Sequence, residues 1–338
     1  MITATAPTIN QIQAWQWNSH DFRAMNTNIY TRLFSTTDDA VLRDVERLFT
    51  SFERQLSRFL PKSELSQLNA APDERFKAGP TLMGAVEVAL WAAALTNGLY
   101  DPTILTHLEQ AGYDRSFEQV DNPQPLTVNS VAAEVSANSQ MYRPKYSFRS
   151  VQANRASGYI YRPVGVKLDL GGMGKGYTVD RAADRLQGLG PFLVNAGGDI
   201  FAYQSPPGKQ GWQIDLTHPL QPGLSMARLY LNHKALATST IAKRRWQHQG
   251  QVKHHLINPR TGQPAVTDAL SVTVVAKRTV LAEVYAKVAL ILGAEAGLAW
   301  LERLPDVDGL IFTNKQEIVY TTGLASMLDC VDPAGYHH

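Results

Sequence analysis

Residues 164–186 read VGVKLDLGGMGKGYTVDRAADRL, and this stretch joins two predicted elements of different kinds. The apolar and β-branched residues of 158–170 predict a strand that carries Asp169 near its end. Apolar residues then recur at three- and four-residue spacing, which predicts a helix that begins near Gly176 with Val179, Ala182, Ala183 and Leu186 on its buried face. The chain therefore passes from a strand into a helix within a few residues.

The turn between these two elements is rich in glycine and contains Lys175 among Gly171, Gly172, Gly174 and Gly176. Backbone N–H groups, a helix N-terminus and an ammonium group converge there, which predicts an anion site suited to a pyrophosphate. The alternative is a tight strand-to-helix turn with an exposed lysine. The spacing differs from that of a Walker loop, since no GxxxxGK[ST] pattern is present.

Helices and strands alternate irregularly along the rest of the chain. Apolar periodicity predicts helices over 38–59, 81–96 and 281–292, and β-branched runs predict strands over 28–34, 146–152, 212–216, 228–231, 270–276 and 310–313. The connections between strands are mostly too short for crossover helices. The sequence therefore predicts an α+β fold with largely antiparallel or mixed sheets, and a long loop over 114–145.

Length and charge exclude several functional classes. The chain has 338 residues, 44% of them hydrophobic and 18% charged, with a net charge of +2. A disordered acidic chain and a strongly basic nucleic-acid binder are both disfavoured.

A single cysteine, Cys330, forms no internal disulfide. The N-terminal residues have no signal-peptide pattern, and no apolar run approaches the length of a membrane span, so we expect a cytoplasmic protein.

Two further segments carry polar groups next to apolar strands. Residues 192–203, FLVNAGGDIFAY, predict a hairpin whose turn contains two glycines. Residues 235–246, ALATSTIAKRRW, and residues 254–265, HHLINPRTGQPA, supply hydroxyl groups, cations and histidines. Acyl transfer is not indicated, because no GxSxG motif is present. Each histidine, taken alone, is most simply a hydrogen-bonded or solvent-facing imidazole.

The order of these segments resembles the ApbE family, the FAD:protein FMN transferases. Its motifs are similar to DLGG, the KG helix start, VNAGGD, ATS, the HHLINPRTGQP segment and the helix that contains LAEVYAK. The resemblance extends to the N-terminal half through RAMNTNIY (23–30), LSRFLPKSELSQLN (56–69) and GLYDPTI (98–104). The similar segments cover about residues 25–322 in the family's order.

The resemblance implies a two-lobed architecture with a cleft for FAD, which is a substrate in this family. It places a single domain over 21–330, after an N-terminal extension (1–20) and before a C-terminal tail (331–338). The implied reaction transfers FMN to a threonine or serine hydroxyl of an acceptor flavoprotein and releases AMP. FAD and this acceptor are the implied partners, with Mg²⁺ as the family's metal ion.

The resemblance also implies roles for individual residues. Flavin contacts are implied for Met25 and for Phe59, where the family more often has tyrosine. The remaining implied FAD-binding residues are Leu99, Tyr100, Asp101, Asp169, Lys175, Thr238 and Ser239. His255 is the implied catalytic histidine, and Lys175 is implied to offset the charge that develops at phosphorus. The implied metal site consists of the Gly172 carbonyl and side chains at the positions of Glu283 and Lys287.

The chain departs from the family pattern mainly at this metal site. Glu283 replaces an aspartate, and Lys287, one helical turn later, replaces a threonine, so an ammonium group faces the carboxylate. An ammonium group and Mg²⁺ repel one another at such a position. Asn258, Thr240 and Asn26 are further departures. Three alternatives stay open: a non-catalytic FAD-binding protein with Lys287 in place of the metal, an FAD pyrophosphatase, and an unrelated anion-binding protein.

Overall fold

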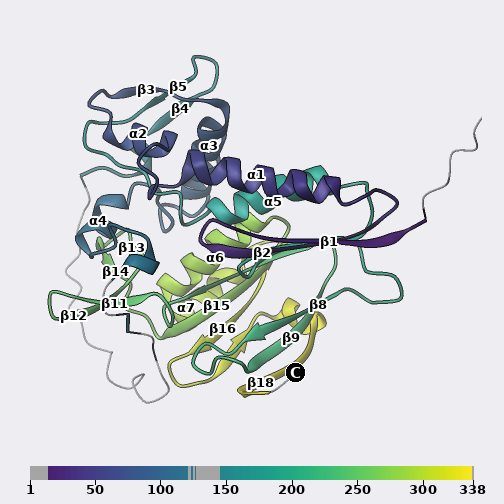
Figure 1. Ribbon diagram of the computed structural model, residues 1–338. Helices are drawn as coiled ribbons and strands as arrows, with labels where there is room; N and C mark the ends of the chain where they lie inside the picture. Colours follow the sequence, from purple (N-terminus) through teal and green to yellow (C-terminus); the bar gives the residue numbers. More distant parts are fainter. Residues whose placement is uncertain (1–13, 121–122, 125, 127–144, 337–338) are drawn as a thin grey trace, which may run out of the picture.

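A computed structural model describes residues 14–120, 123–124, 126 and 145–336. One eight-stranded sheet organises the chain, with the order β1-β2-β6-β7-β10-β15-β16-β17 (Figure 1). Every pair of neighbouring strands in this sheet is antiparallel. The antiparallel arrangement expected from the short connections is therefore confirmed. Most of the loop predicted over 114–145 lies outside the described residues.

The strands of the main sheet are β1 (Gln16–Ala24), β2 (Thr27–Ser35), β6 (Phe192–Ala196), β7 (Asp199–Tyr203), β10 (Lys234–Thr240), β15 (Ala269–Ala276), β16 (Asp308–Thr313) and β17 (Ile318–Tyr320). Smaller sheets contain β3 (Arg75–Lys77), β4 (Gln152–Asn154) and β5 (Tyr159–Tyr161); β8 (Trp212–Thr217), β9 (Ser225–Leu231) and β18 (Leu328–Tyr336); β11 (Arg245–His248) and β12 (Gln251–His254); and β13 (Ile257–Asn258) and β14 (Gln263–Pro264). The α-helices are α1 (Ala40–Leu56), α2 (Glu64–Ala70), α3 (Pro80–Leu95), α4 (Leu105–Gln110), α5 (Gly174–Leu186), α6 (Thr279–Leu292) and α7 (Ala294–Leu301).

The four helices predicted from apolar periodicity are confirmed as α1, α3, α5 and α6. Two predicted strands are wrong over most of their length. Residues 146–152 form a short 3-10 turn, Phe148–Ser150, before β4. Of residues 158–170 only β5 is a strand, because Pro163 and Gly165, whose φ is +85°, interrupt it. Beyond that point the chain is held by a side chain, since Asn69 Oδ1 accepts from Leu168 N–H at 2.7 Å.

Helices cover one face of the main sheet and a second sheet lies against the other (Figure 1). Helices α5 and α6 pack on the central strands, and α1 packs on α5 and β1. The three-stranded sheet β8–β9–β18 meets the main sheet through aromatic contacts, among them His218 with Phe312 at 4.9 Å between ring centroids. The buried aliphatic side chains of these layers form the core, which fixes α5 and α6 over the sheet.

The N-termini of α5 and α6 approach each other at Gly176. A Cβ atom at this position would lie 2.8 Å from the backbone carbon of Thr279, so only glycine allows the contact. Asp180, one turn further along α5, accepts hydrogen bonds from the N–H groups of Thr279 at 2.8 Å and Val280 at 3.1 Å. These are N–H groups of the first turn of α6, which have no partner within their own helix. The Asp180 carboxylate therefore fixes α6 relative to α5.

Asp180→Ala is expected to lower the free energy of unfolding by about 3 kcal/mol, because two buried N–H groups lose their acceptor. Urea denaturation measures the change. Asp184→Ala is the matched control on the same helix: its ion pairs with Arg181 and Arg278 are partly exposed, so about 1 kcal/mol or less is expected. Equal losses in the two variants would contradict this account of Asp180.

Strand structure reaches into both terminal segments, since β1 begins at Gln16 and β18 continues to Tyr336. The division into an extension, one domain and a tail stays a prediction. Among the described residues, no helix combines the length and the apolar character that crossing a bilayer requires.

Candidate functional site

A cavity of about 900 Å³ opens between the helical layer, the central strands and the loops around α4 and β11. This volume is typical of a ligand pocket. Every residue that the sequence assigned to the site lines this one cavity: Met25, Phe59, Leu99, Tyr100, Asp101, Asp169, Gly172, Lys175, Thr238, Ser239, His255, Glu283 and Lys287. The structure thus brings together positions from seven separate segments of the chain. Their individual roles stay predictions.

One wall of the cavity is apolar and aromatic. Met25, in the β1–β2 turn, and Phe59 contribute to it, and the Arg58 guanidinium lies over the rings of Phe59 and Tyr113, 4.1 and 4.8 Å from their centroids. Arg58 Nε also donates to Asp169 Oδ1 at 2.8 Å, and both side chains are about nine-tenths buried. Sequence reasoning missed Arg58, although it stands directly before Phe59 in the segment that resembles the family.

The loop that follows α3 forms a second wall. Leu99, Tyr100 and Asp101 are buried there. The Asp101 carboxylate accepts hydrogen bonds from Thr103 N–H at 2.8 Å, from the Thr103 hydroxyl at 2.7 Å and from Phe148 N–H at 3.0 Å. Burial raises the pKa of Asp101 despite these bonds. The Asp101 carboxylate therefore uses its acceptor positions mainly to stabilise this loop.

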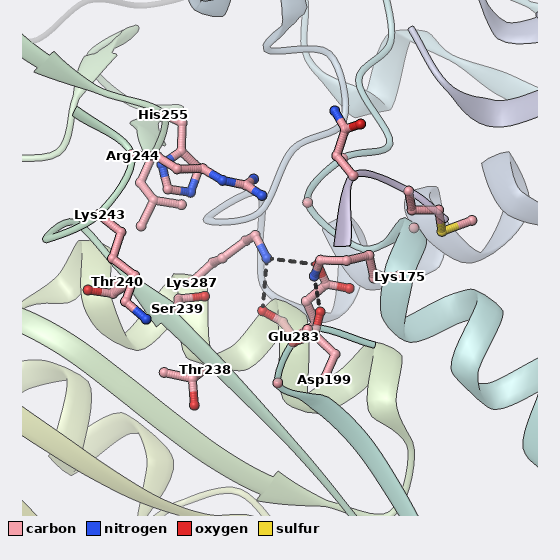
Figure 2. Close-up of a pocket in the computed structure, with 18 of the residues that line it drawn as sticks. Lys175, Asp199, Thr238, Ser239, Thr240, Lys243, Arg244, His255, Glu283 and Lys287 are labelled. Atoms are coloured by element: carbon pink, nitrogen blue, oxygen red, sulfur yellow. Dashed lines mark hydrogen bonds and ion pairs between the residues drawn. The ribbon is translucent and has the colours of Figure 1, made fainter. Parts of the chain in front are cut away.

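The glycine turn places Lys175 at the second residue of α5, and its ammonium group points at two carboxylates. Lys175 Nζ pairs with Asp199 and lies 3.3 Å from Glu283 Oε1. Lys287 Nζ lies 3.2 Å from the same Oε1 atom, and Gly176 N–H donates to Oε2 at 2.8 Å. We call Lys175, Asp199, Glu283 and Lys287 the ammonium–carboxylate cluster (Figure 2).

The two carboxylates of the cluster are buried, whereas the side chains of Lys175 and Lys287 are 23% and 15% exposed. Burial alone would raise the pKa of Glu283, but the charges of Lys175 and Lys287 and the Gly176 N–H lower it to about 2. Burial lowers the pKa of Lys175, while the Glu283 charge raises it. Sequence reasoning missed Asp199 as a site residue. The hairpin predicted at residues 192–203 is confirmed as β6–β7, and Asp199 opens β7 directly after the Gly197–Gly198 turn, whose φ angles are +64° and +97°.

The residues present do not fit a divalent cation. Gly172, Glu283 and Lys287 do come together, since a Cβ atom on Gly172 would lie 3.5 Å from Lys287 Cε. However, two ammonium groups already share the Glu283 carboxylate. Among the described residues, no three acidic, histidine or cysteine side chains are grouped so that they could hold a metal ion.

Strand β10 supplies three hydroxyl groups beside the cluster. Thr238 Oγ1 lies 2.8 Å from Thr273 Oγ1 on β15, and the Thr240 hydroxyl donates to the Leu270 carbonyl at 2.9 Å. Ser239 is buried between them. Thr240, where the family has glycine, is thus accommodated by a backbone hydrogen bond.

His255 and Arg244 complete the cavity on the side of Lys287 (Figure 2). Burial lowers the pKa of His255 well below its ordinary value, and the positive charges of Arg244 and Lys287 lower it further. The imidazole is therefore neutral at pH 7. Within the described chain its Nδ1 atom is buried without a hydrogen-bond partner. A neutral imidazole in this position can accept a proton from a ligand hydroxyl.

The neighbouring His254 has a structural role. One ring nitrogen, Nε2, lies 3.0 Å from the Ala265 carbonyl oxygen, and the other, Nδ1, accepts from Leu256 N–H at 3.3 Å. This pairing uses the neutral form of the ring, since the protonated form could not accept at Nδ1. Burial lowers the pKa of His254 from 6.5 to about 4.

Acidification is therefore expected to destabilise the protein through His254. Between pH 6.5 and 4 the unfolded chain binds a proton that the folded chain does not, so the free energy of unfolding falls as the pH falls. The full contribution is roughly 3 kcal/mol. Urea denaturation at pH 7 and pH 4.5 should show a smaller pH effect for His254→Gln than for wild type. His233→Asn, at an exposed position, should behave as wild type does, and an unchanged pH effect in His254→Gln would contradict the assignment.

The cavity combines the cationic side chains of Lys175, Lys287 and Arg244 with an aromatic wall, features that suit an anionic ligand with an aromatic part. The chain belongs to the ApbE family, whose sequence model matches residues 25–311. Among its relatives is the FAD:protein FMN transferase of Treponema pallidum, 26% identical over 318 residues that cover 90% of this chain and 85% of the relative. The transferase of Vibrio cholerae is 26% identical over 265 residues, which cover 77% of this chain and 75% of that protein.

Solved structures of the family have the same fold. The ApbE protein from Thermotoga maritima superposes with a TM-score of 0.76 at 23% identity, covering 92% of this chain and 99% of that one. The flavin transferase ApbE from Vibrio cholerae gives a TM-score of 0.73 at 20% identity, covering 93% and 100%. The α+β fold class expected from the sequence is thereby confirmed.

Proposed function

We propose that this chain binds FAD and transfers its FMN moiety to a threonine or serine hydroxyl of an acceptor protein, with release of AMP. The observation that carries the proposal is the single cavity in which Lys175, Lys287 and Arg244 face the same space as the neutral His255. Membership of the ApbE family and relatives named FAD:protein FMN transferase support it.

In the proposed step, the hydroxyl oxygen of the acceptor attacks the phosphorus on the FMN side of FAD. A phosphoester P–O bond forms while the phosphoanhydride P–O bond breaks, and its electron pair leaves with AMP. His255 takes the hydroxyl proton, and the ammonium and guanidinium groups offset the charge that develops on the phosphoryl oxygens. The aromatic wall at Phe59 and Tyr113 would pack against the flavin ring, as the sequence resemblance implies for Phe59.

The experiment incubates the purified protein with FAD and a soluble protein extract that serves as the source of acceptors. We expect flavin to become covalently attached to a protein, so that it stays with that protein after denaturation. The amount of AMP released should equal the amount of attached flavin. Free FMN and AMP without labelled protein would instead indicate a pyrophosphatase. FAD that stays bound and intact would indicate a binding protein. The acceptor's identity and the cytoplasmic location stay predictions.

A further inference from the structure

The Glu283 carboxylate has already used the acceptor positions that a metal ion would need. Its Oε2 atom accepts from Gly176 N–H, and its Oε1 atom faces the ammonium groups of both Lys175 and Lys287, at 3.3 and 3.2 Å. Only 3% of the Glu283 side chain is exposed, so water replaces none of these contacts. Mg²⁺ takes oxygen ligands at about 2.0–2.1 Å. An ion on Oε1 would therefore lie close to two positive charges inside a buried site, where the repulsion is strong.

The charge balance of the cluster differs from that of a metal site. Two ammonium groups face two carboxylates, so the cluster as a whole is neutral. The pyrophosphate of FAD carries two negative charges that need positive partners nearby. Lys243 and Arg244, in the connection between β10 and β11, line the same cavity, and no salt bridge among the described residues involves either of them. Together they supply the two charges.

The position of Arg244 supports this assignment. Its side chain lines the cavity together with Lys175, Lys287 and His255, and its positive charge lowers the pKa of both Lys175 and His255. Three cations, Lys175, Lys287 and Arg244, therefore face one space (Figure 2). Like charges held together in a low-dielectric cavity favour binding of an anion between them.

We propose that in this chain Lys287 takes the place of a divalent cation, and that Arg244 and Lys243 supply the positive charge for the FAD pyrophosphate. The site then binds FAD without a metal ion. This inference rests on the proposed function, and it adds the electrostatic means by which this particular chain holds its substrate.

Direct metal binding and FAD affinity together test the inference. The free Mn²⁺ signal in electron paramagnetic resonance should be the same with wild-type protein and FAD as with FAD alone. The dissociation constant for FAD, from flavin fluorescence, should agree within about twofold between EDTA and Mg²⁺. Arg244→Met should weaken FAD binding by about 10- to 100-fold in either buffer, the range of a hydrogen bond to a charged group. Lys209→Thr, an exposed lysine outside the cavity, should have no effect.

A pair of substitutions at Lys287 separates charge from ligand chemistry. Lys287→Met should weaken FAD binding in EDTA, and Mg²⁺ should not restore it. Lys287→Thr restores an oxygen ligand beside Glu283, so Mn²⁺ should now bind and Mg²⁺ should restore FAD affinity. Circular dichroism checks that both variants fold. If either variant does not fold, the Mn²⁺ measurement on the wild type decides whether the site binds a metal ion.

Stoichiometric binding of Mn²⁺ by the wild type, or FAD binding that requires Mg²⁺, would overturn the inference while leaving the proposed function intact. Unchanged FAD affinity in Arg244→Met would also overturn it. A wild type that binds no FAD in either buffer would overturn the proposed function itself.

Discussion

Lys175→Ala is expected to weaken both FAD binding and folding. The variant removes the cation that faces Asp199 and Glu283, and it leaves Asp199 buried without its ammonium partner. Loss of one partner from a buried ion pair costs about 3–5 kcal/mol in the free energy of unfolding. The cluster is also left with a net negative charge, which repels the pyrophosphate and weakens FAD binding by a further 1.5–3 kcal/mol or so. Urea denaturation and flavin-fluorescence titration measure the two effects separately.

Two other lysine substitutions make the result specific to the cluster. Lys175→Met keeps the apolar stem, so its loss of stability reports the charge alone. Lys167→Ala removes an ammonium group from a partly exposed pair with Glu109, for which about 1 kcal/mol or less is expected. If Lys175→Ala kept wild-type affinity for FAD, Lys175 would serve only the folded structure, and the anion site predicted at the glycine turn would be wrong.

The arrangement of the site depends on three segments that the fold places side by side. The first turn of α5 carries Lys175, Asp199 is the first residue of β7, and helix α6 carries Glu283 and Lys287. Asp180 and Gly176 hold α5 and α6 together at this point. The stability of the helix pair and the electrostatics of the site are therefore expected to change together in variants of either helix.

Local patterns predicted the parts of the site, because each motif is contained in a few consecutive residues. The helix periodicity of α1 and α5, the two-glycine hairpin and the polar ends of β10 and β12 were all visible in the sequence. Their contacts were not, since the pair of Lys175 and Glu283 joins residues 108 positions apart. No pattern in one sequence reports which distant carboxylate will neutralise a given lysine.

The wrong strand over 158–170 has a similar cause. Its alternation of apolar residues is typical of a strand, but the backbone of Leu168 bonds to the side chain of Asn69, which is 99 positions away. Asp169 N–H bonds to the Pro102 carbonyl at 2.8 Å. These tertiary contacts satisfy the backbone without a neighbouring strand, and they aim Asp169 at Arg58 instead of along a sheet. The incorrectly predicted segment therefore ends in residues that line the cavity, among them Asp169.

His255→Ala is expected to lower the rate of AMP release by about 10²–10⁴-fold, the usual contribution of a positioned general base. FAD affinity should change little, because the neutral imidazole contributes no charge to pyrophosphate binding. Added imidazole should restore part of the rate, since the truncated side chain leaves space beside the buried cavity wall. Chemical rescue of this kind is not expected from a residue that acts only on folding.

The pH dependence of the rate gives an independent test of His255. Its pKa is well below 6.5 in the folded protein, so the imidazole stays able to accept a proton as the pH falls through 6.5. The rate should therefore hold constant there and decline only when the pH reaches the lowered pKa, where protonation removes the base. A decline centred near pH 6.5 would contradict burial as the cause of the shift. In His255→Ala with saturating imidazole, the decline should instead follow the pKa of the added base, which moves it to higher pH.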